Sequence, residues 1–338
     1  MAKIRVATIG CGSIAQELHL PGYARNRHVE IVACTDPDPK RWAEVREQFG
    51  VKTFYRDYRD MLDREQLDAV SICSPNKFHC EQALAAIGKG LHVLCEKPMT
   101  LTNAEAARVV AAAKRSRRVF MVGFSHRFMR GNIKAHDIIA SGDVGKPFMV
   151  NIRFAHGGPF PGWAKTDWFY NRKLAGGGAL LDMGIHAFDL VRYFMGDVAK
   201  VSASIKTIFK PIEVDDNAVV TFEMKNGTLG YVDVGWTSLP GFTGSAIYCE
   251  KGNILVDYRK GMTLTTGYAN PSGKHKVREK KFSFRPTEGG WAIEMDHFVN
   301  CIRRDAKPKA GVIEGAEAVK IAVAAYESAW TGKRIALR

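Results

Sequence analysis

Four polar residues recur at helical spacing in an otherwise apolar segment near the middle of the chain. They are Asp182, His186, Asp189 and Tyr193, and intervals of four, three and four residues place them on one face of a helix. The other sides of this segment are apolar, so the helix should be buried nearly all round. A buried imidazole can move a proton while a carboxylate one turn away orients it, although the same histidine could be a satisfied core residue. Glycines at 176–178 and 184 indicate that a ligand or another stretch of backbone approaches closely.

Length and composition bound the class of protein. The chain has 338 residues, of which 46% are hydrophobic and 25% charged, enough for two domains with large cores. Apolar runs stay shorter than the 18 or so residues of a membrane span, and the N-terminus leads directly into a strand-like segment. We therefore expect a cytoplasmic protein with no membrane partner. Seven cysteines without C-x-x-C spacing predict reduced core thiols and no metal site.

A formal net charge of +14 raises the possibility of a nucleic-acid partner. Two basic runs, 114–118 and 274–281, favour that possibility. The basic surplus is spread over both halves of the chain, however, and no recognition helix, zinc finger or RNA-binding motif accompanies it. We therefore predict solvated surface charge and no nucleic-acid partner.

The first forty residues predict a dinucleotide-binding turn. A strand over 4–9 precedes a glycine turn and a helix, and a second strand over 29–35 ends at Asp36. The turn consists of Gly10, Cys11, Gly12, Ser13, Ile14 and Ala15. Its glycines would let backbone approach a pyrophosphate at a helix N-terminus, although a glycine turn without a ligand is the alternative. The carboxylate of Asp36 suits ribose hydroxyls and repels a 2′-phosphate, so NAD is expected, with NADP possible because Lys40 and Arg41 lie nearby.

The alternation of strands and helices continues to Gly123, which predicts a doubly wound parallel sheet. Ligands bind such sheets at the carboxyl ends of the strands. The predicted cofactor contacts there are Asp36, Ser74, Asn76, Glu96 and Lys97. A lysine ammonium at this edge can stabilise a substrate oxyanion as hydride leaves, while a structural pair with Glu96 is the alternative.

The second half of the chain predicts a different sheet. Short strands separated by turns are expected over 148–154, 201–209, 218–224, 228–236, 245–250, 254–258 and 262–266, followed by helices over 291–304 and 313–330. This pattern indicates an open, mostly antiparallel meander in a second domain. We place the dinucleotide-binding domain at 1–123 and the substrate-binding and oligomerisation domain at 124–338.

The strand over 218–224 has one fully apolar face, and its opposite face mixes Val219 and Thr221 with Glu223. A solvated face should be more uniformly polar. We therefore expect the second faces of two chains to meet in a homodimer or homotetramer. The alternative is a monomer in which the two C-terminal helices cover this face.

The combination of motifs resembles the glucose–fructose oxidoreductase, inositol dehydrogenase and rhizopine-catabolism (Gfo/Idh/MocA) family of NAD(P)-dependent oxidoreductases. The motifs are the glycine turn, Ser74-Pro75-Asn76 with His79, Glu96-Lys97-Pro98, Gly123-Phe124 with Arg127-Phe128, Gly176-Gly177-Gly178 with Asp182 and His186, and Tyr326-Glu327-Ser328-Ala329. The resemblance implies a Rossmann domain followed by an open sheet, with the active site between them, and a cis peptide before Pro98. It assigns catalysis to Lys97, Asp182 and His186.

Further residues are expected to contact substrate. The resemblance implies His126 and His156, and an aromatic loop containing Trp168 suits the C–H faces of a sugar-sized ligand, unless these rings are core or interface residues. The sequence thus predicts a dehydrogenase that oxidises one carbinol of a sugar, cyclitol or sugar derivative. Two alternatives are an NAD-using lyase or glycosidase that oxidises its substrate transiently, and a non-catalytic NAD-binding regulator.

Overall fold

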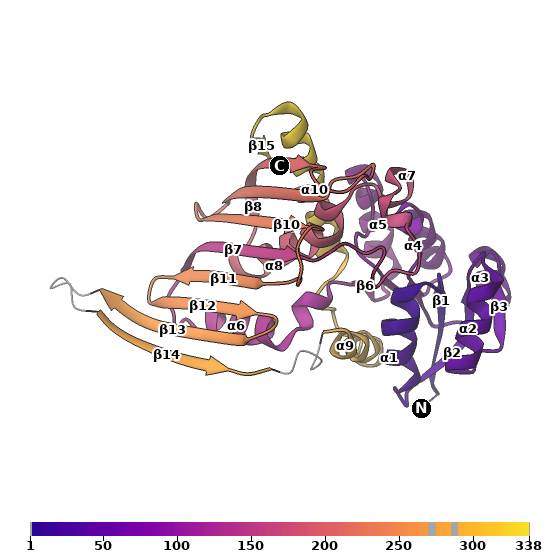
Figure 1. The fold of residues 1–338 in the computed structure, drawn as a ribbon. Helices are drawn as coiled ribbons and strands as arrows, with labels where there is room; N and C mark the ends of the chain where they lie inside the picture. The colour runs from indigo at the N-terminus through magenta and orange to yellow at the C-terminus, as the bar shows by residue number, and fades with distance from the viewer. Residues whose placement is uncertain (1, 270–274, 285–289, 338) are drawn as a thin grey trace. The chain divides into compact units, whose positions relative to one another are not determined.

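The computed structural model describes residues 2–269, 275–284 and 290–337 (Figure 1). The chain forms two compact units. The first contains Met1–Ser125, Pro159–Gly176 and Trp291–Val319, and the second contains His126–Gly158, Gly177–Gly290 and Lys320–Arg338. The first crossing lies beside the predicted boundary at 123, but the chain returns to the first unit twice. A division into 1–123 and 124–338 is therefore too simple, because two later segments pack against N-terminal elements.

The first unit contains a six-stranded parallel sheet in the order β3-β2-β1-β4-β5-β6 (Figure 1). Its strands are β1 (Ile4–Ile9), β2 (Val29–Thr35), β3 (Thr53–Tyr55), β4 (Ala69–Ile72), β5 (His92–Cys95) and β6 (Phe120–Val122). Every residue of β4 is buried, as expected for a strand covered by helices on both faces. The predicted doubly wound sheet is confirmed, and β3 is an additional strand.

Several helices in the first unit begin at side-chain caps. Its elements are η1 (Ala15–His19), α1 (Leu20–Ala24), α2 (Pro39–Phe49), α3 (Tyr58–Arg64), η2 (Asn76–Phe78), α4 (His79–Gly88), α5 (Asn103–Ser116), η4 (Trp168–Tyr170), α7 (Arg172–Ala175) and α9 (Trp291–Arg304). Asp38 and Asp57 cap α2 and α3, and Thr102 forms a capping box with Glu105 at α5. The element η1 is a π-helical turn.

Helix α9 belongs to the first unit because it packs on α1. The side chain of Met295 fills the space beside Gly22, where an added Cβ would lie 2.4 Å from its Cγ. Asn26 donates a 3.1 Å hydrogen bond to Asp296. Helix α10 (Val312–Thr331) begins in the first unit and ends in the second.

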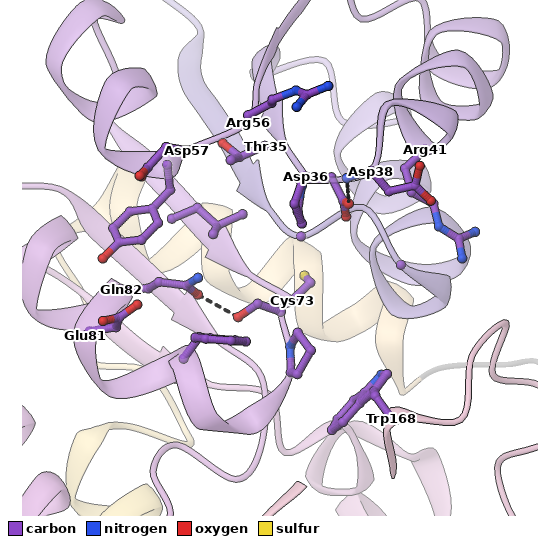
Figure 2. A pocket seen from close by; sticks show the side chains of 18 of the residues that line it. Thr35, Asp36, Asp38, Arg41, Arg56, Asp57, Cys73, Glu81, Gln82 and Trp168 are labelled. Atoms are coloured by element: carbon purple, nitrogen blue, oxygen red, sulfur yellow. Dashed lines mark hydrogen bonds between the residues drawn. The ribbon is translucent and has the colours of Figure 1, made fainter. Parts of the chain in front are cut away.

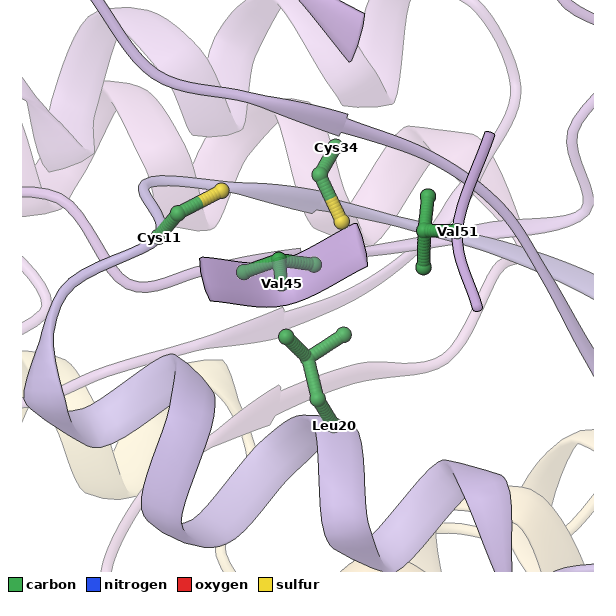
Figure 3. Close-up of a cluster of buried hydrophobic side chains, with 5 residues drawn as sticks. All are labelled: Cys11, Leu20, Cys34, Val45 and Val51. Carbon is green, nitrogen blue, oxygen red and sulfur yellow. The ribbon is translucent and has the colours of Figure 1, made fainter. Parts of the chain in front are cut away.

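A small buried cluster lies at the glycine turn after β1 and contains two cysteines. Cys11 and Cys34 pack with Leu20, Val45 and Val51 (Figure 3). The neighbouring Cys34 thiol and burial both raise the pKa of Cys11 well above its ordinary value, so this thiol stays protonated. All seven cysteines are free thiols, and six of them are buried. The prediction of reduced core thiols is confirmed.

The second unit contains a nine-stranded sheet in the order β14-β13-β12-β11-β7-β10-β9-β8-β15. Its strands are β7 (Pro147–Ala155), β8 (Val198–Lys206), β9 (Asn217–Met224), β10 (Leu229–Gly235), β11 (Gly244–Cys249), β12 (Gly252–Asp257), β13 (Gly261–Ala269), β14 (His275–Phe282) and β15 (Ile335–Ala336). All neighbours are antiparallel except β7 and β10. The mostly antiparallel sheet is confirmed, but β7 lies between β10 and β11 and interrupts the expected meander.

The basic run at 274–281 was expected to carry solvated surface charge, and its residues 277–281 are exposed on strand β14. Lys274 lies outside the described residues, and the remainder of the run pairs with β13 at the edge of the sheet. Lysines on an edge strand discourage pairing with another chain.

Helices cover one face of this sheet (Figure 1). They include α6 (Arg130–Ser141) and the π-helical turn η5 (Leu180–Gly184), which continues into α8 (Ile185–Met195). Helix α8 packs on β7 and β10, and only its residues Arg192 and Tyr193 are not fully buried. The predicted burial is confirmed. By length and composition alone the stretch 172–195 could cross a membrane, but 89% of its 18-residue apolar part is buried inside the fold, so this stretch is weak evidence for a membrane span.

The opposite face of the nine-stranded sheet keeps apolar side chains at the surface. Ala218, Val220, Phe222 and Met224 are buried, whereas the alternate residue Val219 is 50% exposed. Leu229 and Leu255 are 55% and 44% exposed on neighbouring strands. The alternative in which the C-terminal helices cover this face is therefore wrong for these positions.

Candidate functional site

A cavity of about 440 Å³ opens at the carboxyl ends of β1, β2 and β4 in the first unit (Figure 2). Of the predicted cofactor contacts, Gly10, Gly12, Asp36 and Ser74 line it. Its other polar or aromatic lining residues include Thr35, Asp38, Arg41, Arg56, Asp57, Arg59, Gln82 and Trp168. The cavity therefore offers backbone, carboxylate and guanidinium groups at the edge where parallel sheets bind ligands.

The two glycines of the turn serve different purposes. Gly10 has a φ of +92°, and an added Cβ would lie 2.7 Å from the backbone nitrogen of Ser74, so only glycine fits between β1 and β4. A Cβ on Gly12 would meet nothing within 4 Å. This open side leaves room for a phosphate beside the helix that starts at Ser13. The predicted residues Ile14 and Ala15 lie in the first turn of that helix.

Asp36 ties the glycine turn to the end of β2. Its Oδ2 accepts a 2.8 Å hydrogen bond from the amide of Cys11, and its Oδ1 accepts one of 2.9 Å from the amide of Asp38. Each carboxylate oxygen can accept a further hydrogen bond. Arg41 lies on the same cavity but pairs with Glu44 at 3.2 Å, which reduces its attraction for a 2′-phosphate.

A lysine holds the segment 159–176 against this turn. The amide of Lys165 donates to Ser13 Oγ at 3.1 Å, and its Nζ lies 2.9 Å from Gln16 Oε1 and 3.0 Å from Glu44 Oε2. Hydrogen bonds from Gln16, Lys165 and Arg41 lower the pKa of Glu44 to about 2, against the opposing effect of burial. The segment then places Trp168 on the cavity. The structure thus positions Trp168, predicted to contact substrate, in the nucleotide-binding unit.

The side chains of Asn76 and Glu96 form hydrogen bonds with other residues of the first unit. Asn76 donates a 2.9 Å hydrogen bond to the carbonyl of Ala175. Glu96 Oε1 lies 2.9 Å from His19 Nε2, and Glu96 Oε2 accepts from the amide of Lys97 at 3.2 Å. Burial raises the pKa of Glu96, but the hydrogen bond from His19 and the charges of His19 and Lys97 outweigh it and hold this pKa below its ordinary value. Glu96 therefore anchors the backbone at Lys97.

The segment that carries Lys97 is fixed from a second direction. The ring of His79 lies 2.7 Å from the carbonyl of Pro98 and 2.8 Å from that of Ser74, so it links the segments after β4 and β5. The peptide bond before Pro98 is cis, as the family resemblance implied.

In the second unit, Asp215 caps the start of the helix that carries Asp182 and His186, formed by η5 and α8. Its two carboxylate oxygens accept from the amides of Gly178 at 2.9 Å and Leu180 at 2.8 Å, and Tyr326 donates to it at 2.7 Å. A Cβ on Gly178 would lie 1.9 Å from the Asp215 carbonyl oxygen. The close approach predicted from the glycines is therefore an approach of backbone. Asp215 carries no local sequence signal, because its partner lies 37 residues away.

Asp182 and His186 lie in a buried cluster with two further histidines. Asp182 Oδ2 accepts a 3.2 Å hydrogen bond from the indole of Trp236 and lies 3.8 Å from His156 Nε2. The ring of His186 stacks on His126 with centroids 4.2 Å apart and planes 15° from parallel. The structure thus brings four predicted residues of this unit together. It adds Trp236, which sequence reasoning treated only as part of a strand.

The four polar residues predicted on one face of the helix, Asp182, His186, Asp189 and Tyr193, divide into two pairs. Asp189 forms a buried ion pair with Arg127, with hydrogen bonds of 2.6 and 2.7 Å. The guanidinium of Arg127 also lies 4.9 Å from the centre of the Tyr193 ring. Asp189 and Tyr193 therefore have structural partners, which leaves Asp182 and His186 as the candidates for chemistry on this helix face. Among the described residues, no group of three or more His, Cys, Asp or Glu could hold a metal ion.

The parallel sheet, the glycine turn and the carboxylate after β2 define the first unit as an NAD-binding Rossmann domain of an oxidoreductase. Residues 4–124 match the profile of the oxidoreductase family with an NAD-binding Rossmann fold, and residues 133–255 match the GFO/IDH/MocA C-terminal domain. The chain therefore belongs to the Gfo/Idh/MocA oxidoreductase family.

Curated relatives align over nearly the whole chain. The D-glucoside 3-dehydrogenase of Escherichia coli is 27% identical over 99% of this chain and 98% of its own length. The myo-inositol 2-dehydrogenase of Thermotoga maritima is 26% identical over 96% of both chains. Among solved structures, the aldose-aldose oxidoreductase from Caulobacter crescentus, complexed with glycerol, has a TM-score of 0.83 and 25% identity over 99% of this chain and 100% of its own. A levoglucosan dehydrogenase, complexed with NADH and levoglucosan, shares the fold with a TM-score of 0.86 at 23% identity, over 99% of both chains.

Proposed function

We propose that this protein is an NAD-dependent dehydrogenase that oxidises one carbinol of a sugar, cyclitol or sugar derivative. The observation that carries the proposal is the buried cluster of Asp182 and His186 with His126 and His156, in a chain whose other unit has a nucleotide cavity. Support for the substrate class comes from the two curated relatives, which are named for a glucoside and for myo-inositol.

The first unit fits a bound NAD. The open side of Gly12 accommodates the pyrophosphate, and Asp36 accepts the hydroxyls of the adenosine ribose. When bound, NAD would supply the hydride acceptor for oxidation of the carbinol carbon. Trp168 and Thr166 contribute to the same cavity, so we assign Trp168 to the cofactor rather than to the substrate.

The residues of this chain then move the proton. His186 takes the hydroxyl proton as general base. Asp182, whose carboxylate accepts a hydrogen bond from Trp236, orients His186. Lys97 stabilises the oxyanion that develops, with its backbone fixed by Glu96. The sugar-facing roles of His126 and His156, like that of Lys97, are carried over from the family resemblance.

The test is a panel of sugars, glycosides and cyclitols incubated with NAD, read by NADH absorbance and by product analysis. Stoichiometric NADH and a ketone product would support the proposal. Product without net NADH would instead identify a lyase or glycosidase that regenerates its cofactor. Tight NAD binding without turnover of any panel member would favour a regulator.

We also propose that two copies of the chain meet through the exposed face of the nine-stranded sheet. Val219, Leu229 and Leu255 give this face exposed apolar side chains that a second copy would cover. The cytoplasmic location and the absence of nucleic-acid, membrane and metal partners stay predictions from the sequence.

A further inference from the structure

The ring of His126 lies between the catalytic cluster and a pair of residues with no assigned role. One face stacks on His186 with centroids 4.2 Å apart, and Phe154 packs edge-to-face with the ring at 4.7 Å between centroids. Its Nδ1 lies 3.0 Å from the hydroxyl of Tyr258, which follows β12. That hydroxyl in turn lies 2.8 Å from Nδ2 of Asn132 on α6.

The orientation of Asn132 follows from its second contact. The same Nδ2 lies 2.8 Å from the backbone carbonyl of His126, which can only accept a hydrogen bond. The amide nitrogen, and not the amide oxygen, must therefore occupy this position. One hydrogen of the amide is directed to the carbonyl and the other to the oxygen of Tyr258.

This arrangement sets the direction of the next hydrogen bond. The oxygen of Tyr258 accepts from Asn132, and its hydrogen needs an acceptor inside this buried group, so we infer that the hydrogen is directed to Nδ1 of His126. Burial raises the pKa of Tyr258 well above its ordinary value, although the hydrogen bond from Asn132 opposes the effect. The phenol therefore remains a donor at physiological pH. A neutral His126 that accepts at Nδ1 carries its hydrogen on Nε2.

If His126 were protonated at Nδ1, its N–H and the O–H of Tyr258 would be two hydrogen-bond donors facing each other. The hydroxyl of Tyr258 would have to rotate away from its acceptor while Asn132 still donated to its oxygen. A second cost comes from His186, because two imidazolium rings with centroids 4.2 Å apart repel each other. Both effects favour a neutral His126.

The other titratable groups of this unit near the ring have partners of their own. Asp182 accepts from Trp236 and lies beside His156, whose ring stacks on Phe242 at 6.0 Å. Asp189 is paired with Arg127, the residue after His126. Their contacts are consistent with a His126 whose protonation state is governed by Tyr258 and His186.

We propose that Tyr258 and Asn132 are positioning residues that hold His126 as the neutral Nε2–H tautomer, so that His186 alone of the stacked pair takes up a proton. The inference rests on the proposed function only in assigning His186 as the base. The tautomer of His126 can be measured without any substrate.

The experiment is long-range ¹H–¹⁵N NMR of the full chain labelled with ¹⁵N-histidine, recorded from about pH 5.5 to 8.5. The His126 signals are assigned by their loss in His126→Asn. We expect the wild-type ring to show the neutral Nε2–H pattern over the whole range. In Tyr258→Phe, His126 should lose this single tautomer and titrate. Tyr248→Phe removes another hydroxyl of the same sheet, one that accepts from Asn151, and should leave the pattern unchanged.

A wild-type His126 that titrates in this range, or that carries its hydrogen on Nδ1, would overturn the proposal even if Tyr258→Phe fails to fold. With a substrate from the panel, the pH profile of kcat in Tyr258→Phe should gain a second ionisation, whereas a merely structural role would lower kcat without changing the profile. Failure of every panel substrate would refute the dehydrogenase assignment and leave the NMR result intact.

Discussion

The amide of Cys11 donates a 2.8 Å hydrogen bond to Asp36, so the carboxylate after β2 is already oriented by the turn after β1. The same turn leaves the Gly12 side open. A ribose would therefore meet a carboxylate fixed by two backbone amides, which lowers the cost of ordering the site when the cofactor binds.

Asp36→Ser should weaken the preference for NAD over NADP. Wild-type kcat/KM should favour NAD, and the substitution should reduce that ratio by about 10- to 100-fold, since hydrogen bonds to a charged group contribute about 1.5–3 kcal/mol. Steady-state kinetics with both cofactors measure the ratio. Asp60→Ser, an exposed change outside the cavity, is the control. Equal kcat/KM for both cofactors in the wild type would refute the prediction.

His186→Gln should remove the general base. The oxidation rate should fall by about 10²- to 10⁴-fold, the range for such a group. Wild-type oxidation should rise with pH as this base loses its proton. His28→Gln, in the first unit, should leave the rate and the profile unchanged. A His186→Gln enzyme with near wild-type rate and a flat profile would exclude His186 from the mechanism.

Lys165→Met should weaken NAD binding by releasing the segment that places Trp168 on the cavity. The loss should be only about 2- to 5-fold, because exposed ion pairs contribute at most about 1 kcal/mol. Isothermal titration with NAD measures it, and Lys173→Met on the same segment is the control. A Kd equal to that of the control would show that the segment is held by other contacts.

Acid should weaken the contact between Glu44 and Lys165. The ordinary pKa of Glu44 is 4.5, and the folded chain lowers it to about 2, so the carboxylate stabilises the fold fully above pH 4.5 and loses this contribution as pH falls toward 2. The difference in thermal midpoint between wild type and Glu44→Gln should therefore shrink below about pH 4. An undiminished difference at low pH would contradict this assignment.

Sequence patterns were sufficient for the parallel sheet because its signals are local. Apolar runs such as β4 are continuous, and the glycine turn, Asp36 and Ser74 each lie within two residues of the end of a strand. Helix α6 was missed because its first turn contains Gly131 and Asn132, which are poor helix formers. Strand β14 was missed because its many charged residues hide the alternation of apolar and polar side chains that predicts a strand. Such a charged strand is stable at the edge of a sheet, where its side chains are solvated.

The residues missed at the site are those whose partners are remote in sequence. Asp215 caps a helix 37 residues away, and Tyr258 contacts His126 across 132 residues. Trp168 was assigned to substrate because aromatic rings suit the C–H faces of a sugar, whereas contacts such as those of Lys165 and Asn76 show that its segment returns to the nucleotide-binding unit. Periodicity reports which side of an element is buried, but it does not report which elements meet.

Gly178→Ala should destabilise the second unit, because the added Cβ would lie 1.9 Å from a backbone oxygen of Asp215. Overpacking of this kind typically costs about 1–3 kcal/mol, and displacement of the cap would add to it. Urea unfolding followed by circular dichroism measures the change. Gly88→Ala in α4 has open space around its Cβ and should be neutral or stabilising by about 0.4–1 kcal/mol. Equal midpoints for the two variants would show that the helix start tolerates movement.

The exposed face of the nine-stranded sheet predicts the state of assembly. Val219 and Leu229 lie 50% and 55% exposed on adjacent strands, and Tyr231 is 36% exposed on the second of them. Light scattering at micromolar concentration should therefore give a mass at least twice the 37.5 kDa of one chain. Val219→Lys with Leu229→Lys would bring like charges together across a two-fold axis and should shift the mass toward the monomer, because buried unpaired charges are costly. Gln48→Lys with Ala107→Lys makes the same charge change on exposed positions of the first unit and should leave the assembly intact. A wild-type protein that scatters as a single 37.5 kDa species would refute assembly through this sheet.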